Sequence, residues 1–218
     1  NCSSAASDVY KRQNRGIESL GGGGVGFCLN NKSKLVFEKV LKEDIEDVLM
    51  LKVKRKGNKK WELLFGVVYF EVEGRQGGWE KNKKIADFII QEVEKAKQEG
   101  LKIFIGDLNG HICELDGHDN RNGEIVKGIA ENGELEILNC IMEHMDAPTW
   151  ERGELKYRLD YCLTCGKGLE STKKGEIMEI GVGVGKDHAG VKITIEASDK
   201  GNIICLLYTS PSPRDEAL

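Results

Sequence analysis

The chain has 218 residues, of which 39% are hydrophobic and 31% are charged, and its formal net charge is -4. This composition is typical of a soluble globular protein with one domain and a substantial core. The negative net charge excludes a global positive field, so any binding of nucleic acid would depend on local basic patches. The sequence contains no apolar run close to the ~20 residues that span a membrane, and we expect no membrane partner.

The two ends of the sequence resemble read-through of a sequencing-library adapter. The similarity covers residues 4–13 and 206–215, and two of the three prolines lie in the second stretch, at Pro211 and Pro213. We therefore expect residues 1–13 and 205–218 to be adapter-like and disordered, and residues 14–204 to form the domain. Because the chain also begins without Met, we expect it to be a piece of a longer product.

Cysteine usage indicates the compartment. Seven cysteines are present, and five of them lie outside the suspect ends, at Cys28, Cys113, Cys140, Cys162 and Cys165. An odd number without a secretory signal predicts reduced thiols in an intracellular protein, either cytoplasmic or nuclear. The CxxC spacing of the last two falls within a predicted strand, where residues three apart point to opposite faces, so we do not interpret it as a metal site.

The hydrophobic pattern predicts an alternation of strands and helices. Between residues 79 and 98 the apolar positions Ile85, Phe88, Ile89 and Val93 share one helical face, whereas most other apolar runs are short and bounded by turn residues. We predict helices at 79–98 and 123–132, a hairpin turn at Gly57-Asn58, glycine-rich loops at 21–24 and 181–186, and strands at 25–29, 35–40, 48–54, 61–70, 101–105, 135–140, 155–163, 176–180 and 191–195.

The most informative stretch follows the apolar run at residues 101–105. Gly106 ends that run, and Asp107 and Asn109 follow it. Ligands bind at the carboxyl ends of strands in α/β folds, and acid and amide side chains can hold a hard cation and a phosphate oxygen there. The alternative is a strand followed by an Asx-type turn, with both residues as ordinary turn formers.

Polar residues stand beside strands at three places: Asp107 with Asn109, then Asp160, then Asp187 with His188. If the sheets bring these places together, the acids and the amide can bind Mg²⁺ and a phosphate group. A histidine paired with an aspartate can stabilise the charge on a pentacovalent phosphorus. In such a site Asp160 would fix the ring orientation of His188.

Four motifs in this order give the sequence a family resemblance. They are Gly106-Asp107-Leu108-Asn109, Thr149-Trp150, Arg158-Leu159-Asp160-Tyr161 and Asp187-His188. Together they resemble the endonuclease/exonuclease/phosphatase superfamily, and residues 24–27 and 66–70 resemble the endonuclease domains of non-LTR retrotransposons. The similarity covers roughly residues 20–196.

The resemblance implies an α/β fold: a two-sheet β-sandwich flanked by helices in four layers (α/β/β/α), here lacking its first strands. It also implies residue roles. Asp107 would align or deprotonate the attacking water, and Asn109 would hold the scissile phosphate. Asp187 would help to bind the metal. His188, oriented by Asp160, would contact the phosphate and stabilise the transition state.

The implied activity is hydrolysis of DNA phosphodiester bonds by an endonuclease of a retrotransposon-type polyprotein, associated with a reverse transcriptase. Its cofactor would be Mg²⁺ or Mn²⁺ and its partner DNA, and Tyr69 would lie near the scissile phosphate. Two alternatives stay open. One is a catalytically dead domain that binds nucleic acid or protein, and the other is a phosphatase of the same superfamily.

The sequence departs from the family pattern at its start and near its last motif. The family begins with a strand bearing an Asn and a strand ending in a metal-binding Glu, and neither is recognisable here. Lys186 stands where the family has Ser, and Phe70-Glu71 stands where it often has a proline. A lysine beside the metal site disfavours cation binding. We therefore expect weak or no activity from this chain.

Overall fold

A computed structural model describes residues 8–11, 26–29, 35–40, 42, 44–45, 47–55, 58–96, 100–179, 187–196 and 203–208. Its centre is a six-stranded sheet in the order β3-β4-β5-β6-β10-β7. The strands of this sheet are β3 (Leu35–Val40), β4 (Val48–Arg55), β5 (Asn58–Tyr69), β6 (Leu101–Asp107), β7 (Leu135–Ile137) and β10 (Asp160–Cys165). The pair β5 and β6 is parallel, and every other pair in this sheet is antiparallel.

A second sheet of three antiparallel strands contains β11 (Thr172–Ile177), β12 (Val191–Glu196) and β13 (Ile203–Tyr208). Two smaller sheets are the pair β1 (Asp8–Lys11) with β2 (Gly26–Leu29) and the hairpin of β8 (Trp150–Arg152) with β9 (Leu155–Tyr157). The helices are α1 (Gly78–Lys95), α2 (Cys113–Asp116), α3 (Arg121–Asn132), α4 (Leu138–Ile141) and α5 (Gly166–Ser171).

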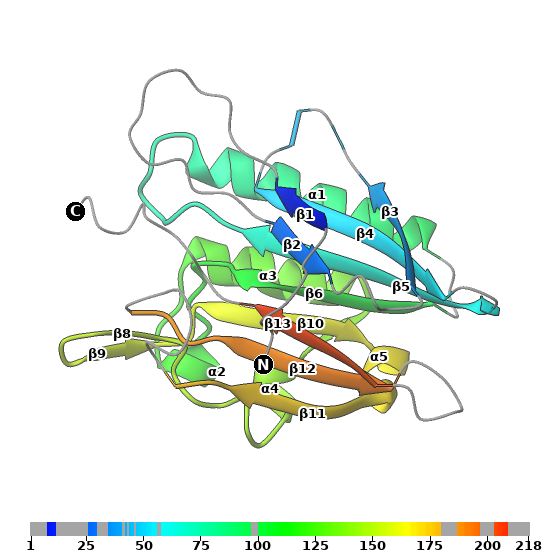
Figure 1. Ribbon diagram of the computed structural model, residues 1–218. Coiled ribbons are helices and arrows are strands. Elements are labelled where there is room, and N and C mark those ends of the chain that lie inside the picture. Colours follow the sequence, from blue (N-terminus) through cyan, green and yellow to red (C-terminus); the bar gives the residue numbers. More distant parts are fainter. Residues whose placement is uncertain are drawn as a thin grey trace.

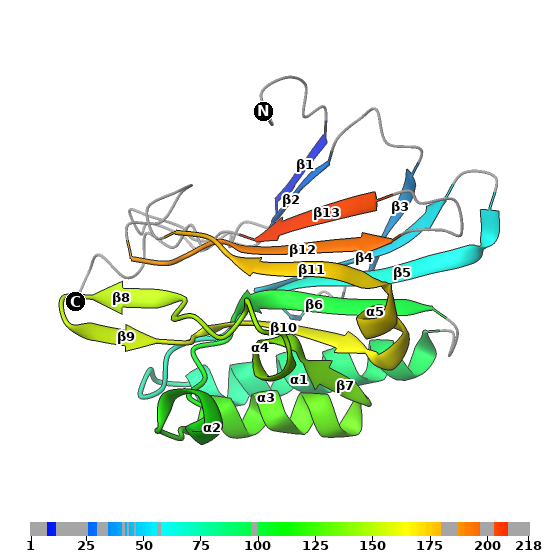
Figure 2. The same ribbon diagram turned by 90° about the horizontal axis from the view of Figure 1, so that it is seen from below.

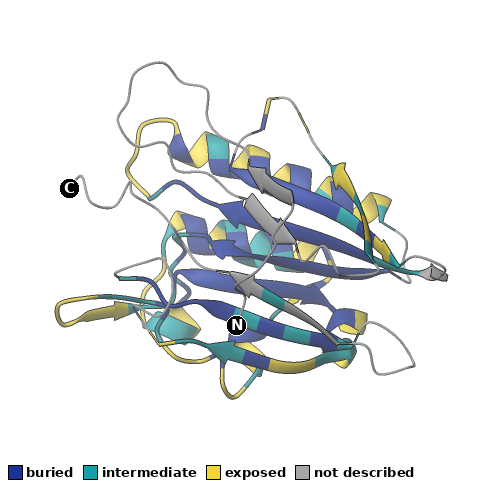
Figure 3. Cartoon of the chain, viewed as in Figure 1, coloured by how far each residue is buried: buried dark blue, intermediate teal, exposed yellow. Residues whose placement is uncertain are grey.

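The elements form layers, as the two views in Figures 1 and 2 show. Helices α1 and α3 cover one face of the six-stranded sheet, and the three-stranded sheet covers the other. Strand β6 is buried along its whole length because it lies between these layers. Its residues alternate: Phe104 packs in the core on the helix side, whereas Ile103 and Ile105 pack in the core between the sheets. Figure 3 shows this buried centre in dark blue.

The predicted α/β class and two-sheet sandwich are therefore confirmed. Within the part of the chain that the structure describes, no helix lies over the outer face of the three-stranded sheet, which faces the viewer in Figure 1. None of the helices in the described ranges is both long and apolar enough to cross a membrane.

Four predicted elements differ from the structure. The strand predicted at 176–180 lies at 172–177, as β11. The predicted strand at 135–140 is a short strand, β7, followed by helix α4. The predicted strand at 155–163 is divided at Arg158 and Leu159 into β9 and β10, because the two intervening N–H groups bond to side chains. The helix predicted at 123–132 begins two residues earlier, at Arg121, and Asn120 caps it by accepting from the Gly123 N–H group.

Gly106 has a different role from the predicted one. It lies inside β6 and does not end the strand, which continues to Asp107. A Cβ atom at this position would lie 1.8 Å from the carbonyl oxygen of Val68 on β5. Glycine is therefore required here by the close approach of the neighbouring strand.

The chain ends also differ from the expectation that they are disordered. Strand β1 lies within residues 1–13 and pairs with β2, and most of β13 lies within residues 205–218 and pairs with β12. The glycine-rich stretches at 21–24 and 181–186, Lys186 included, lie outside the described residues, as does Gly57 of the predicted turn.

Candidate active site

Two strand ends meet at the point where the sequence places its first two acids. Asp107 is the last residue of β6, Asp160 is the first residue of β10, and the two are direct partners in the antiparallel register. Side chains alternate along a strand, so Asp107 shares its face with Ile105 and Asp160 shares its face with Cys162. Both neighbours pack in the core between the sheets. The two carboxylates therefore face the three-stranded sheet, and both are buried.

His188 reaches these carboxylates from the segment that enters β12. Its Nδ1 lies 2.9 Å from Oδ2 of Asp160, and its Nε2 lies 3.9 Å from Oδ2 of Asp107. A carboxylate only accepts, so the Nδ1–H group donates to Asp160. The backbone of His188 pairs with Trp150 at the start of β8, and this bridge fixes the backbone from which the ring extends. The structure thus brings together three residues, of which the first and the last are 81 positions apart in the sequence.

The surrounding charges keep the imidazole of His188 protonated. Burial by itself lowers the pKa of this group, but the hydrogen bond to Asp160 and the charges of three neighbouring aspartates outweigh it. The pKa is raised to about 9. A buried cation is therefore held between two carboxylates at neutral pH.

Asp160 is held in place by the backbone and by two side chains from other segments. The Oγ1 atom of Thr149 accepts hydrogen bonds from the N–H groups of Leu159 and Asp160, both at 2.9 Å. The side chain of Asn139 donates to the Asp160 carbonyl at 3.2 Å and accepts from the Cys162 N–H at 3.0 Å. These bonds stop the preceding segment from continuing into β10 and aim the carboxylate at His188.

We predict that Thr149→Val lowers the free energy of unfolding by about 1–3 kcal/mol, because the substitution leaves two buried N–H groups without an acceptor. Thr149→Ser is the matched control: it keeps the hydroxyl and removes only a methyl group. Urea denaturation of the three proteins at one pH measures the effect. Equal stabilities of the Val variant and the wild type would show that these hydrogen bonds do not hold the segment.

Asn109 lies beside the three buried residues in a left-handed conformation, with φ of 44°. Its N–H group donates to Oδ1 of Asp107 at 3.1 Å, and its Nδ2 donates to the carbonyl of Phe70 at 2.8 Å. The carboxamide thus ties the loop after β6 to the end of β5. The bond from Asn109 to Asp107 is the one expected of an Asx-type turn, so the turn interpretation of this stretch agrees with the structure.

A buried amide network, which the sequence did not reveal, holds the same two loops. Asn122 donates to the carbonyl of Glu71 at 2.9 Å and to that of Asn109 at 3.2 Å. Asn82 on α1 donates to the Glu71 carbonyl and to Oδ1 of Asn122. Both asparagines lie on the buried faces of their helices, where the hydrophobic period predicts apolar residues. A polar amide at such a position is the only sign in the sequence of a buried hydrogen-bond network. The network fixes the distance between the ends of β5 and β6.

Tyr69 and Asp187 lie next to the group without joining it. Tyr69, the last residue of β5, is buried and is the register partner of Asp107 on the parallel strand. Asp187 is half-buried, and its Oδ2 accepts from Nε1 of Trp150 at 3.2 Å. Its charge also contributes to the raised pKa of His188. The family resemblance implies that Asp187 helps to bind the metal, whereas in the structure its carboxylate is directed to the indole of Trp150.

The residues that converge fit a divalent cation. One ligand atom each from Asp107, Asp160 and His188 lies within 4.8 Å of the others. Oδ1 of Asp160 is buried and has no hydrogen-bond partner among the described residues, so a positive ligand would satisfy it. Carboxylate oxygens such as those of Asp107 and Asp160 suit Mg²⁺ and Mn²⁺.

A cavity of about 460 Å³ opens beside Asn109. Among the residues that line it are His111, His118 and Tyr157. The rings of His111 and Tyr157 meet edge to face with centroids 4.8 Å apart, and Tyr157 also stacks on Trp150 at 5.7 Å. The cavity therefore combines aromatic surface with Asn109, whose N–H group bonds to Asp107.

Comparison with solved structures supports the same fold. No protein-family model and no curated protein matches the chain. The endonuclease domain of TRAS1, a telomere-specific non-LTR retrotransposon, is similar in structure with a TM-score of 0.52 and 18% identity, over 73% of this chain and 68% of that domain. The 3'-5' exonuclease NExo from Neisseria meningitidis gives a TM-score of 0.53 and 14% identity, over 75% and 71%.

A second structure of NExo, described as a 3' phosphatase bound to a product DNA hairpin, gives a TM-score of 0.53 and 14% identity over 74% of this chain and 70% of that one. These similarities agree with the resemblance that the four sequence motifs predict. At such low identities they concern the fold.

Proposed function

We propose that this chain, which has the fold of the endonuclease/exonuclease/phosphatase superfamily, hydrolyses phosphodiester bonds of DNA with the help of Mg²⁺ or Mn²⁺. The observation that carries the proposal is the buried group of Asp107, Asp160 and His188, whose ligand atoms come within 4.8 Å at meeting strand ends. Buried charges are costly to maintain, and a fold keeps them together where they serve a reaction.

The residues that would hold the cation are Asp107 and Asp160, with Asp187 at the edge of the group. The protonated ring of His188 has no free nitrogen lone pair and would not be a ligand. When bound, a divalent cation neutralises the charge of the phosphate and acts as a Lewis acid on its oxygens. The uncompensated Oδ1 of Asp160 supports this placement.

The chain's own residues would then divide the work of the reaction. Asp107 would accept a proton from the attacking water, and the hydrogen bond from the Asn109 N–H group would hold its carboxylate in orientation. His188 carries a positive charge in a buried position, where it would stabilise the negative charge that develops on the phosphoryl oxygens. Asp160 orients that ring through Nδ1, and Asn109 and Tyr69 lie at the strand ends where the phosphate would enter.

Two observations favour DNA as the substrate. The TRAS1 domain, which is similar in fold, is described as an endonuclease. NExo, also similar in fold, is described as a 3'-5' exonuclease and, in a second structure, as a 3' phosphatase bound to a product DNA hairpin. The aromatic cavity beside Asn109 offers rings on which the sugar or base of a nucleotide can stack. We propose that it receives the nucleotide next to the cleaved bond, as part of a retrotransposon-type endonuclease.

The proposal predicts that the chain nicks supercoiled plasmid DNA in the presence of Mg²⁺ or Mn²⁺, at a low rate because the family's N-terminal Asn and Glu motifs are not recognisable here. EDTA is expected to abolish the nicking because no cation then neutralises the phosphate. Gel electrophoresis of the plasmid forms measures the rate. Binding of DNA without any metal-dependent nicking would contradict the proposal and favour a catalytically dead binding domain. Release of inorganic phosphate from a phosphorylated DNA end, without nicking, would favour the phosphatase alternative.

A further inference from the structure

An exposed indole stands at the start of α1, outside both cores. Trp79 is 41% exposed and is the largest of the hydrophobic side chains that stand out from the described surface. The apolar face of α1 is formed by Ile85, Phe88 and Ile89, which are all buried. Packing therefore does not account for Trp79, and a large exposed aromatic ring is a typical feature of binding surfaces.

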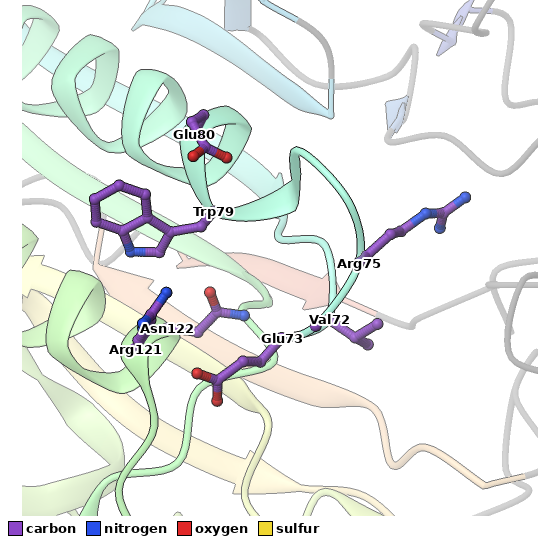
Figure 4. Close-up of a pocket in the computed structure, with 8 residues that line it drawn as sticks. Val72, Glu73, Arg75, Trp79, Glu80, Arg121 and Asn122 are labelled. Atoms are coloured by element: carbon purple, nitrogen blue, oxygen red, sulfur yellow. The ribbon is translucent and has the colours of Figure 1, made fainter.

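Two cations accompany the ring. Nζ of Lys83, one turn further along α1, lies 4.7 Å from the centroid of the Trp79 ring. The guanidinium carbon of Arg121, the first residue of α3, lies 6.0 Å from the same centroid. The arrangement of Trp79 and Arg121 is shown in Figure 4. Two helices thus place positive charges at one exposed aromatic surface, although the chain as a whole is acidic.

The ring borders a cavity of about 200 Å³ that is adjacent to the candidate active site. Among its other lining residues are Arg75 and Asn122, the latter from the amide network that holds Asn109. Val72 and Glu73 line both this cavity and the larger one beside Asn109. Both cavities therefore border the segment 72–73, and an extended chain could occupy both.

We infer that Trp79 is a stacking platform for an unpaired base of the nucleic-acid substrate, with Arg121 and Lys83 contacting the phosphates beside that base. The inference rests on the proposed function, because it places a second part of the same strand. Aromatic rings flanked by cations bind single strands through stacking and charge, without regard to sequence. Inside an intact duplex both faces of each base are already stacked, so the platform selects substrates with an unpaired base near the cleavage site.

The test is a binding measurement without metal, so that it does not depend on catalysis. Fluorescence anisotropy in EDTA compares two labelled DNAs of equal length, a blunt duplex and a duplex with an unpaired overhang. The wild type is expected to bind the overhang DNA more tightly. Trp79→Ala is expected to weaken binding of the overhang DNA by on the order of tenfold and to leave the blunt duplex nearly unchanged.

Two variants serve as controls. Trp79→Phe keeps an aromatic ring and is expected to retain most of the preference. Ile141→Ala removes another exposed apolar side chain, 48% exposed on α4 and outside both cavities, and is expected to bind like the wild type. Equal binding of the overhang DNA by wild type and Trp79→Ala would overturn the inference, as would equal losses in the Ala and Phe variants. A wild type without any preference for the overhang would overturn it too.

The outcomes separate this inference from the proposed function. If the protein prefers the overhang DNA through Trp79 but does not nick plasmid, the stacking platform is supported and the nuclease function is refuted. If the protein nicks plasmid but binds both DNAs equally, the nuclease function is supported and the stacking platform is refuted.

Discussion

Asp107→Asn is expected to lower the rate of metal-dependent nicking at least about 100-fold. The carboxamide has nearly the same volume as the carboxylate, so the strand end keeps its shape. It cannot take a proton from water, however, and it removes one negative charge from the pair that flanks the His188 ring. A cation bound at this group would also lose an anionic ligand.

The rate is measured on supercoiled plasmid at a fixed Mn²⁺ concentration, with denaturation curves to show that the variant is folded. Asp87→Asn is the matched control, because it makes the same change of charge at an exposed position on α1. Nicking by Asp107→Asn at the rate of the wild type would remove Asp107 from the reaction.

Asp160→Ala is expected to lower the free energy of unfolding by about 3 kcal/mol and to reduce nicking as strongly as the loss of Asp107. Asp160 is fully buried, and its Oδ2 forms the 2.9 Å hydrogen bond with His188. Without it the charged ring has no direct partner on Nδ1. Release of the ring proton limits the loss of stability, but it also removes the positive charge that the reaction requires.

Asp160→Asn separates the two contributions. The carboxamide oxygen can still accept from Nδ1 of His188, so most of the stability is expected to return, whereas the missing charge keeps the nicking rate low. Urea denaturation and plasmid nicking at the same pH give both values. An Asp160→Ala protein as stable as the wild type would show that the ion pair does not form in solution.

The parts of the site that the sequence predicts are those set by local pattern. The apolar run before Asp107 predicts a buried strand, and alternation along that strand determines which face the carboxylate shares. The pairing of Asp107 with Asp160 is different, since it depends on the register of two strands separated by more than fifty residues. Only the order of motifs, through the family resemblance, suggested that the two would meet.

The parts that sequence reasoning missed depend on side chains that bond to the backbone. Residues 155–163 read as one strand because their apolar pattern is continuous, but Thr149 and Asp116 accept the N–H groups at the break. The roles of Asn122 and Asn139 were missed for a similar reason. An asparagine in a sequence gives no indication of which distant carbonyl its amide reaches.

The prediction that the chain ends are disordered differs from the structure for a comparable reason. A tail that resembles an adapter has not been selected to pack on this sheet, yet β13 contains two isoleucines and a tyrosine, residues that favour strands, and it pairs with the edge of β12. Backbone pairing at an edge strand requires little of the sequence beyond this propensity.

The most direct measurement is a double-variant cycle on nicking with Asp107→Asn, His188→Gln and the two combined. If both side chains act on one phosphate, each single variant loses at least about 100-fold, and the double variant loses little more than the worse single one. Losses that multiply in the double variant, or a rate that neither substitution changes, would show that Asp107 and His188 do not form one reaction centre.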